Sequence, residues 1–107
     1  MHLTALPLVA LAPALHVDLA GLSARLPGAR VTEGQDEPAA VAVVTTPGDV
    51  RSWLRRGAAV IAVAPSVDRR VELLDAGAVT AADRCGSTEL AARVAAVLRR
   101  LAIAPTP

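Results

Sequence analysis

Few side chains of this chain could do chemistry, and those few stand apart from one another. The two histidines are His2 and His16, and the one cysteine is Cys85. Metal and nucleophile sites need such groups at short, defined spacings, as in CxxC, HExxH or GxSxG, and none of these patterns occurs. No glycine-rich phosphate loop occurs either. We therefore predict that the protein is not an enzyme and holds no metal and no cofactor.

The charge of the chain gives no reason to expect binding to nucleic acid. The formal net charge is +1, and all basic side chains are arginines, since the sequence has no lysine. A basic cluster of Arg51, Arg55 and Arg56 does surround the one tryptophan, Trp53. Such a cluster could stack on a base and pair with phosphates. We favour the simpler interpretation, in which Trp53 packs in the core and the arginines face solvent.

The apolar run Leu6–Leu15 is the only candidate for a targeting or membrane segment. No lysine or arginine precedes it, as a secretory signal would require, and Pro7 and Pro13 interrupt it. A buried strand explains this run better. We expect a cytoplasmic protein with no membrane partner, and one cysteine is consistent with a reducing compartment because it cannot form an internal disulfide.

Apolar runs alternate with amphipathic stretches along the chain, which is typical of a parallel sheet covered by helices. The expected strands are 3–11 (starting at Leu8 if Pro7 is excluded), 29–32, 39–45, 58–64 and 78–82. The expected helices are 18–26, 50–56 after a Pro47–Asp49 turn, 67–76 and 88–102. The acidic loop 33–38 leaves little room for a helix between the second and third strands.

Helical spacing assigns an inward face to each helix. In the first helix this face is Leu19, Leu22 and Leu26. For the second it is Val50, Trp53 and Leu54, and for the third Val67, Val71 and Leu74, with Asp68, Glu72 and Asp75 outside. The last helix has a longer apolar stripe made of Leu90, Val94, Val97, Leu98 and Leu101.

Two stretches near the end of the chain carry a family resemblance. Residues 71–80 read VELLDAGAVT, and residues 89–100 read ELAARVAAVLRR. They resemble the end of bacterial response-regulator receiver domains, and the last helix is most similar to the subfamily with a winged-helix DNA-binding domain. Residues 41–48 and 60–64 resemble the third strand with its loop and the fourth strand. The resemblance extends over 39–101 and is weak before that.

This resemblance implies a flavodoxin-like (CheY-like) α/β fold. It would have a five-stranded parallel sheet with helices on both faces, with the second helix reduced or absent. Residues 1–102 would form the receiver-like domain, and 103–107 a tail or the start of a linker to an effector domain. DNA would then be bound only through that attached domain.

The sequence departs from the receiver pattern wherever the family carries out phosphoryl transfer. Ala10–Pro13 stands where an acidic pair should hold magnesium, Thr45 or Thr46 where the phosphoacceptor aspartate should be, and Ala64 where a hydroxyl is expected. Asp83–Cys85 replaces the lysine region, and Ala81 or a neighbour replaces the aromatic switch residue. Magnesium needs oxygen ligands, and phosphoryl transfer needs an acceptor, a metal and a cation. We predict neither phosphotransfer nor a magnesium site.

What the family pattern retains is the surface that receivers commonly use for dimerisation. Mixed charges there suit a homodimer in which a patch meets its own copy, although a merely solvated helix surface would have the same composition. The residues expected on this face are Arg69, Arg70, Glu72, Asp75, Asp83, Arg84, Glu89, Arg93 and Arg100. We expect a phosphorylation-independent regulator of transcription that acts by dimerisation or by contact with a regulatory protein.

Two alternatives stay open. The same fold could sense a small apolar molecule in the pocket that the lost acidic residues leave, lined by Ala10, Leu11, Ala12, Thr45, Thr46, Ala64 and Arg84. The chain could also be an unrelated small α/β enzyme or carrier domain.

Overall fold

The computed structural model describes residues 6–15, 17–34, 37–83 and 86–103, and within them the chain forms one five-stranded sheet and four α-helices. The strand order is β2-β1-β3-β4-β5, and every neighbouring pair is parallel. The strands are β1 (Leu8–Leu11), β2 (Arg30–Glu33), β3 (Val41–Val44), β4 (Ala59–Val63) and β5 (Thr80–Ala82). The predicted fold class is therefore confirmed.

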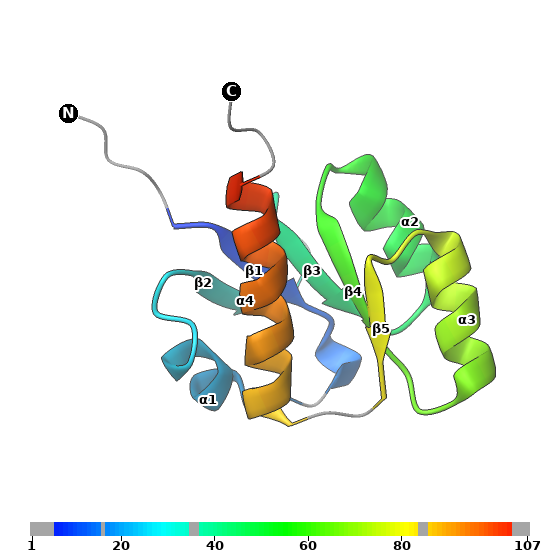
Figure 1. Ribbon diagram of the computed structural model, residues 1–107, viewed down its shortest axis with the longest axis horizontal. Coiled ribbons are helices and arrows are strands. Elements are labelled where there is room, and N and C mark those ends of the chain that lie inside the picture. The colour runs from blue at the N-terminus through cyan, green and yellow to red at the C-terminus, as the bar shows by residue number, and fades with distance from the viewer. Residues whose placement is uncertain (1–5, 16, 35–36, 84–85, 104–107) are drawn as a thin grey trace.

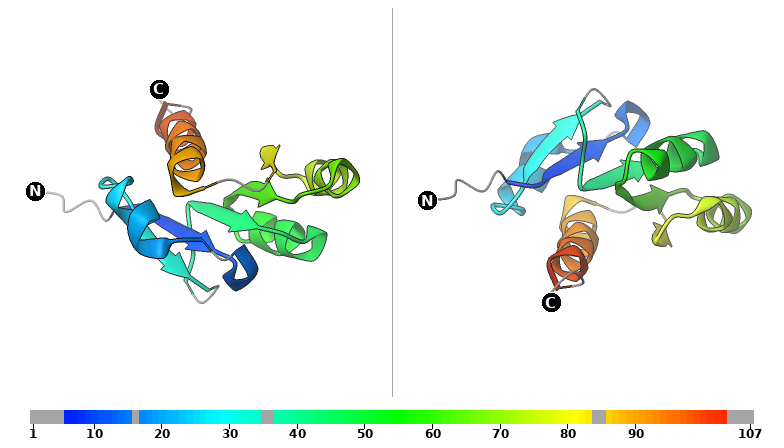
Figure 2. Two further views of the ribbon diagram at one scale, coloured as in Figure 1. Left: turned by 90° about the horizontal axis from the view of Figure 1, so that it is seen from below. Right: turned by 90° about the horizontal axis from the view of Figure 1, so that it is seen from above.

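Helices cover both faces of this sheet (Figures 1 and 2). On one face lie α1 (Leu19–Ala24) and α4 (Ser87–Ile103), and on the other lie α2 (Pro47–Arg55) and α3 (Val67–Ala76). A short 3-10 helix, η1 (Pro13–Leu15), follows β1 and was not expected from the sequence. No helix in the described part of the chain is long and apolar enough to cross a membrane.

The sheet separates two apolar clusters, because successive side chains of a strand point to opposite faces. Val9 and Leu11 of β1 pack in the cluster under α1 and α4, whereas Ala10 packs in the cluster under α2 and α3. All four residues of β3 are buried, as expected for a central strand of a parallel sheet covered on both sides. Because their side chains are buried on both faces of the sheet, β1 and β3 contain no polar residues.

The connection from β2 to β3 contains no helix in its described residues 34 and 37–40. β2 is adapted to this: Val31 packs on the α1/α4 side, while alternation turns Arg30 and Thr32 toward the other face, to which the β2–β3 connection adds no helix in its described residues. Arg56 donates from Nη2 to the Glu37 carbonyl oxygen at 3.0 Å and so ties the connection to the end of α2. The expectation of a reduced or absent second helix is confirmed.

Side-chain caps determine where three helices begin. Thr46 Oγ1 accepts a hydrogen bond from the Asp49 backbone N–H at 3.1 Å, and Asp18 and Ser66 cap α1 and α3 in the same way. The predicted turn at Pro47–Asp49 is therefore wrong, since these residues form the first turn of α2. Proline is favourable there because its missing N–H would have no helical partner.

The predicted inward face of α3 is also wrong. Leu73 is the fully buried residue of this helix, whereas Val67, Val71 and Leu74 are 64%, 49% and 45% exposed. The helix has apolar residues on two sides, and α3 lies at the β5 edge of the molecule, where one side has no layer over it (Figure 2). The side with fewer apolar residues is the one that packs on the sheet.

Three other leucines predicted to face inward are partly exposed. Leu54 of α2 packs beside α3, where a side chain at Gly77 would collide with it, but it is 38% exposed. Leu19 and Leu101 are exposed because they lie near the ends of α1 and α4. The other apolar residues of the two predicted faces are buried in the core, namely Leu22 and Leu26 for the first and Leu90, Val94 and Val97 for the last. Leu98 packs partly against the same cluster, and Val50 and Trp53 are buried as predicted.

Candidate functional site

Short uncharged side chains follow β1, β3 and β4 at the carboxyl edge of the sheet, where the receiver chemistry was expected to be lost. Ala12 and Ala64 are buried, and Thr45 is half-buried. Thr46 is exposed, and its hydroxyl caps α2. Magnesium needs a set of hard oxygen ligands, and these alanine and threonine residues do not fit one. Among the described residues there is also no group of three or more His, Cys, Asp or Glu side chains able to hold a metal.

The predicted ligand pocket at this edge stays a prediction. The structure brings Ala12, Thr45, Thr46 and Ala64 to one edge, because parallel strands end there together. Ala10 and Leu11 are buried within β1, and their side chains belong to the clusters on opposite faces of the sheet. Arg84 lies outside the described residues.

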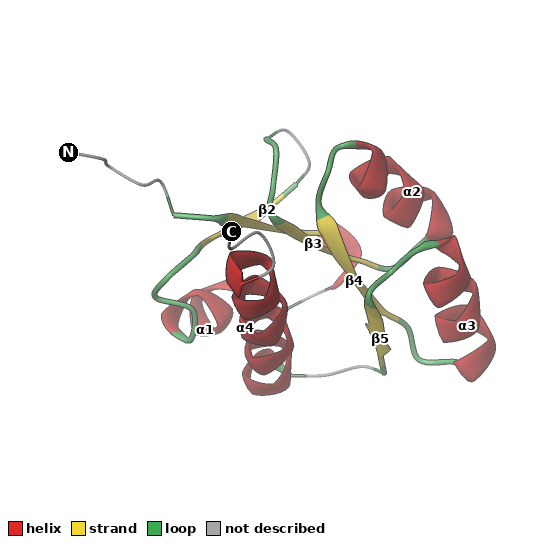
Figure 3. Ribbon diagram, turned by 45° about the horizontal axis from the view of Figure 1, so that its top comes forward, coloured by secondary structure: helices red, strands yellow, loops and turns green. Residues whose placement is uncertain are grey.

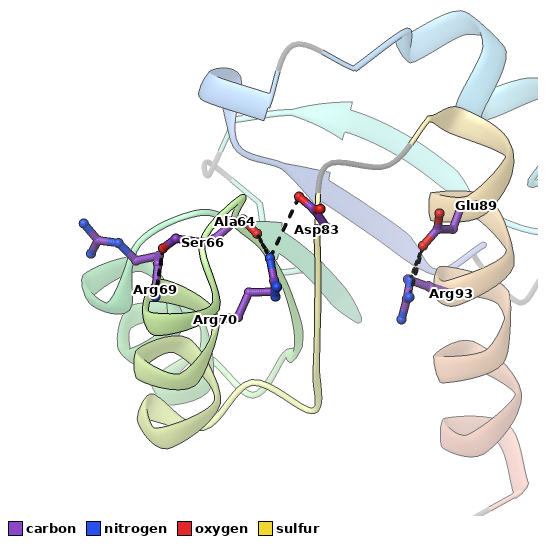
Figure 4. Close-up of polar contacts among 7 residues, drawn as sticks. All are labelled: Ala64, Ser66, Arg69, Arg70, Asp83, Glu89 and Arg93. Atoms are coloured by element: carbon purple, nitrogen blue, oxygen red, sulfur yellow. Dashed lines mark hydrogen bonds and ion pairs between the residues drawn. The ribbon is translucent and has the colours of Figure 1, made fainter.

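An arginine links three elements at the same edge (Figure 4). Arg70, in the first turns of α3, donates from Nη1 to the carbonyl oxygen of Ala64 after β4 at 2.8 Å. The same nitrogen lies 3.9 Å from Asp83 Oδ1 after β5. Arg70 is partly buried, so its main role in the structure is to hold α3 against the ends of β4 and β5.

The direction of Arg70 also shows which side of α3 faces β5. With about 100° of rotation per residue, the stripe of Val67, Val71 and Leu74 lies next to Arg70 around the helix axis, on the side toward β5 and outward. Val79, just before β5, is 49% exposed as well. Beside it, a hollow of about 150 Å³ lies between β5 and α4, lined by Val79, Thr80, Arg93, Ala96, Val97 and Arg100. We call the stripe, Val79 and this hollow the association face.

Some of the charged residues expected on this face lie between α3 and α4, and others lie on the far side of α3. Arg93 donates from Nε and Nη2 to Glu89 Oε2 at 3.1 and 3.0 Å, and Nη1 lies 3.4 Å from Thr80 Oγ1. Figure 4 shows Arg70, Asp83, Glu89 and Arg93 around the region between α3 and α4. Arg69 points away from Arg70 and pairs with Glu72 at 3.9 Å, so these two lie on the other side of α3. Asp75 flanks the exposed stripe, and Arg84 is outside the described residues.

Sequence reasoning missed the apolar part of this face. The spacing of Val67, Val71 and Leu74 was visible but was assigned to the core, and Val79 was placed in a strand. A stripe of three exposed apolar residues beside one fully buried leucine is a signal that a helix has two contact surfaces.

The basic cluster on α2 does not form a stacking platform. Trp53 is 1% exposed, and the Arg56 guanidinium carbon lies 4.1 Å from its ring centroid. The tryptophan is thus in the core, as predicted, and Arg51, Arg55 and Arg56 are exposed. A base could not reach the face of this ring.

Comparisons with known proteins give structural neighbours only. No family model and no curated protein sequence matches the chain. The receiver domain of DrrB activated with BeF3 has a TM-score of 0.73 at 19% identity, over 90% of this chain and 100% of that one. A response regulator from Thermotoga maritima has a TM-score of 0.72 at 15% identity, over 89% and 99% of the two chains.

A CheY-like receiver domain from Methanospirillum hungatei JF-1 has a TM-score of 0.68 at 17% identity, over 90% of this chain and 96% of that one. The TM-scores establish the architecture, whereas identities this low show nothing about the chemistry. The chain has the fold of response-regulator receiver domains.

Proposed function

We propose that this protein is a regulatory domain of receiver fold that accepts no phosphoryl group and acts by associating with a second copy of itself through the association face. The observation that carries the proposal is the exposed stripe of Val67, Val71 and Leu74, next to Val79. Apolar side chains gathered on one side of a small domain favour a contact surface over a solvated one.

The charges and shape of the association face favour a second copy as the partner. Basic and acidic side chains alternate around it, with Arg70 beside Asp83 and Arg93 beside Glu89. In a twofold dimer each patch meets itself, so a patch with both signs can pair across the axis without net repulsion. The hollow between β5 and α4 offers space for an apolar side chain of the other copy.

Transcription is the process that this domain would regulate. The support is the resemblance of residues 89–100 to the final helix of receivers that carry a winged-helix domain. Residues 103–107 would then lead from the domain of residues 1–102 toward a DNA-binding effector. Dimerisation of the receiver part would place two such effectors on one DNA site.

Charge placed on the stripe is expected to break the dimer. In the double variant Val71→Asp/Leu74→Asp, two carboxylates would be buried at the contact without partners, which costs several kcal/mol. By light scattering after size exclusion we expect a dimer for the wild type and a folded monomer for the variant. Leu6→Asp, which changes an exposed leucine elsewhere, is the control and should remain dimeric.

This proposal fails if the wild type is monomeric at high concentration, or if the double variant stays dimeric with an unchanged circular dichroism spectrum. A heteronuclear NMR titration would give a second measurement. On dilution, chemical-shift changes should concentrate on α3, β5 and α4.

Phosphoryl donors are expected to leave the chain unmodified. With acetyl phosphate and Mg²⁺, the intact mass should not increase by one phosphoryl group, because alanine and threonine stand where acceptor and metal ligands would be needed. The single variant Thr45→Asp should also remain unmodified, since it restores neither metal ligands nor a lysine. A phosphorylated wild type would contradict the first half of the proposal while leaving the association face untouched.

A further inference from the structure

A second hollow of the molecule lies at the end of the sheet where the strands begin. The alanine and threonine residues that follow β1, β3 and β4 lie at the other end. This second hollow has a volume of about 600 Å³, within the range of about 300–1,000 Å³ typical of small-molecule sites. Pro7, Ala29 and Ala40, which precede β1, β2 and β3, line its base. The turn after α1 and the last turns of α4 form its walls. We call it the basal groove.

Much of the lining of the basal groove is part of the hydrophobic core. Leu26 and Ala29 are buried members of the cluster under α1 and α4, and Ala40, Ala95 and Leu98 pack against that cluster. A ligand in the groove would therefore contact core residues directly. Burial of its apolar part would favour the folded state, and binding would raise the melting temperature.

The rim of the groove carries charge of one sign. Arg25 and Arg99 are its charged lining residues, and no Asp or Glu lines it. Arg25 donates from Nε to Thr88 Oγ1 at 2.9 Å, which holds the side chain in place and uses one of its five N–H donors. Among the described residues Arg99 forms no ion pair. The guanidinium fork matches carboxylate and phosphate oxygens.

We propose that the basal groove binds a small amphiphile that has an unbranched apolar body and a single anionic headgroup, carboxylate or phosphate. The headgroup would pair with Arg99, and the body would lie along Leu26, Ala40 and Leu98. An apolar lining that includes two arginines and no carboxylate favours this class over a neutral or cationic ligand. This inference does not depend on the association face, which lies along α3, β5 and the other side of α4.

The two arginines at the end of α4 provide a matched pair for the test. Arg99 lines the basal groove, whereas Arg100, the next residue, lines the hollow beside β5. Arg99→Gln and Arg100→Gln make the same chemical change on different sides of one helix. A general effect of lowering the net charge would change both variants equally.

Decanoate and decyl phosphate are the probes, and decyltrimethylammonium, with the same chain length and the opposite charge, is the comparison. In NMR titrations of the full chain we expect decanoate, decyl phosphate or both to bind with a dissociation constant on the order of 1 mM or tighter. Shifts should centre on residues 25–29, 40 and 95–101. Arg99→Gln should weaken this binding about threefold to tenfold, and Arg100→Gln should leave it unchanged.

Several results would overturn the proposal. They are the absence of shifts in the groove, equal binding of decyltrimethylammonium, or equal weakening in both arginine variants. Groove shifts that follow protein concentration instead of decanoate would assign the groove to a second copy. Because the titration can be repeated on Val71→Asp/Leu74→Asp, failure here is distinguishable from failure of the association face.

Discussion

Replacing Trp53 with alanine is expected to lower the free energy of unfolding by about 3–5 kcal/mol. Trp53 is the largest of the fully buried side chains and the one aromatic residue of the chain. It fills the space between α2 and the sheet that Val44, Val50, Val60 and Leu73 share with it. The core around it consists of short aliphatic side chains, which cannot move far enough to fill the cavity.

Urea denaturation followed by circular dichroism measures this effect, since the variant has no tryptophan for fluorescence. Arg51→Ala, on the exposed side of the same helix, is the control, and we expect a change within about 0.5 kcal/mol. Domains of this size are stable by only about 5–15 kcal/mol, so the loss of Trp53 would remove a large part of the total. A loss below about 1 kcal/mol would show that Trp53 is not a core residue.

The strands were predictable because burial on both faces leaves little choice of residue. β3 and β4 read as uninterrupted aliphatic runs, and the structure places both in the middle of the sheet. β5 begins at Thr80 and is shorter than predicted, although the Val79 backbone N–H already donates to the carbonyl oxygen of Val60 in β4 at 2.8 Å.

The missing carboxylates and the basal groove differ in how far the sequence could show them. The lack of carboxylates after β1 and β3 is a local property and was visible at once. The basal groove was not visible, because its lining is drawn from residues as far apart as Pro7 and Leu101. Only the packing of α4 against α1 and β3 brings these residues together (Figure 3).

The orientation of α3 leads to the second large expected effect. Leu73→Ala should lower the free energy of unfolding by about 2–5 kcal/mol, whereas Leu74→Ala, one residue later, should change it by less than about 1 kcal/mol. Leu73 has no exposed surface, and Leu74 is 45% exposed. The two variants make the same chemical change in the same helix, so the difference between them measures which side of α3 packs on the sheet.

The same pair separates folding from association. Leu74→Ala should weaken the dimer in sedimentation experiments while its urea midpoint, measured at a concentration where the wild type is monomeric, stays near that of the wild type. Leu73→Ala should lower that midpoint. Equal loss of stability in both variants would restore the inward face first expected from the spacing of Val67, Val71 and Leu74. The association face would then lose its apolar centre, because one stripe of side chains cannot both fill the core and meet a second copy.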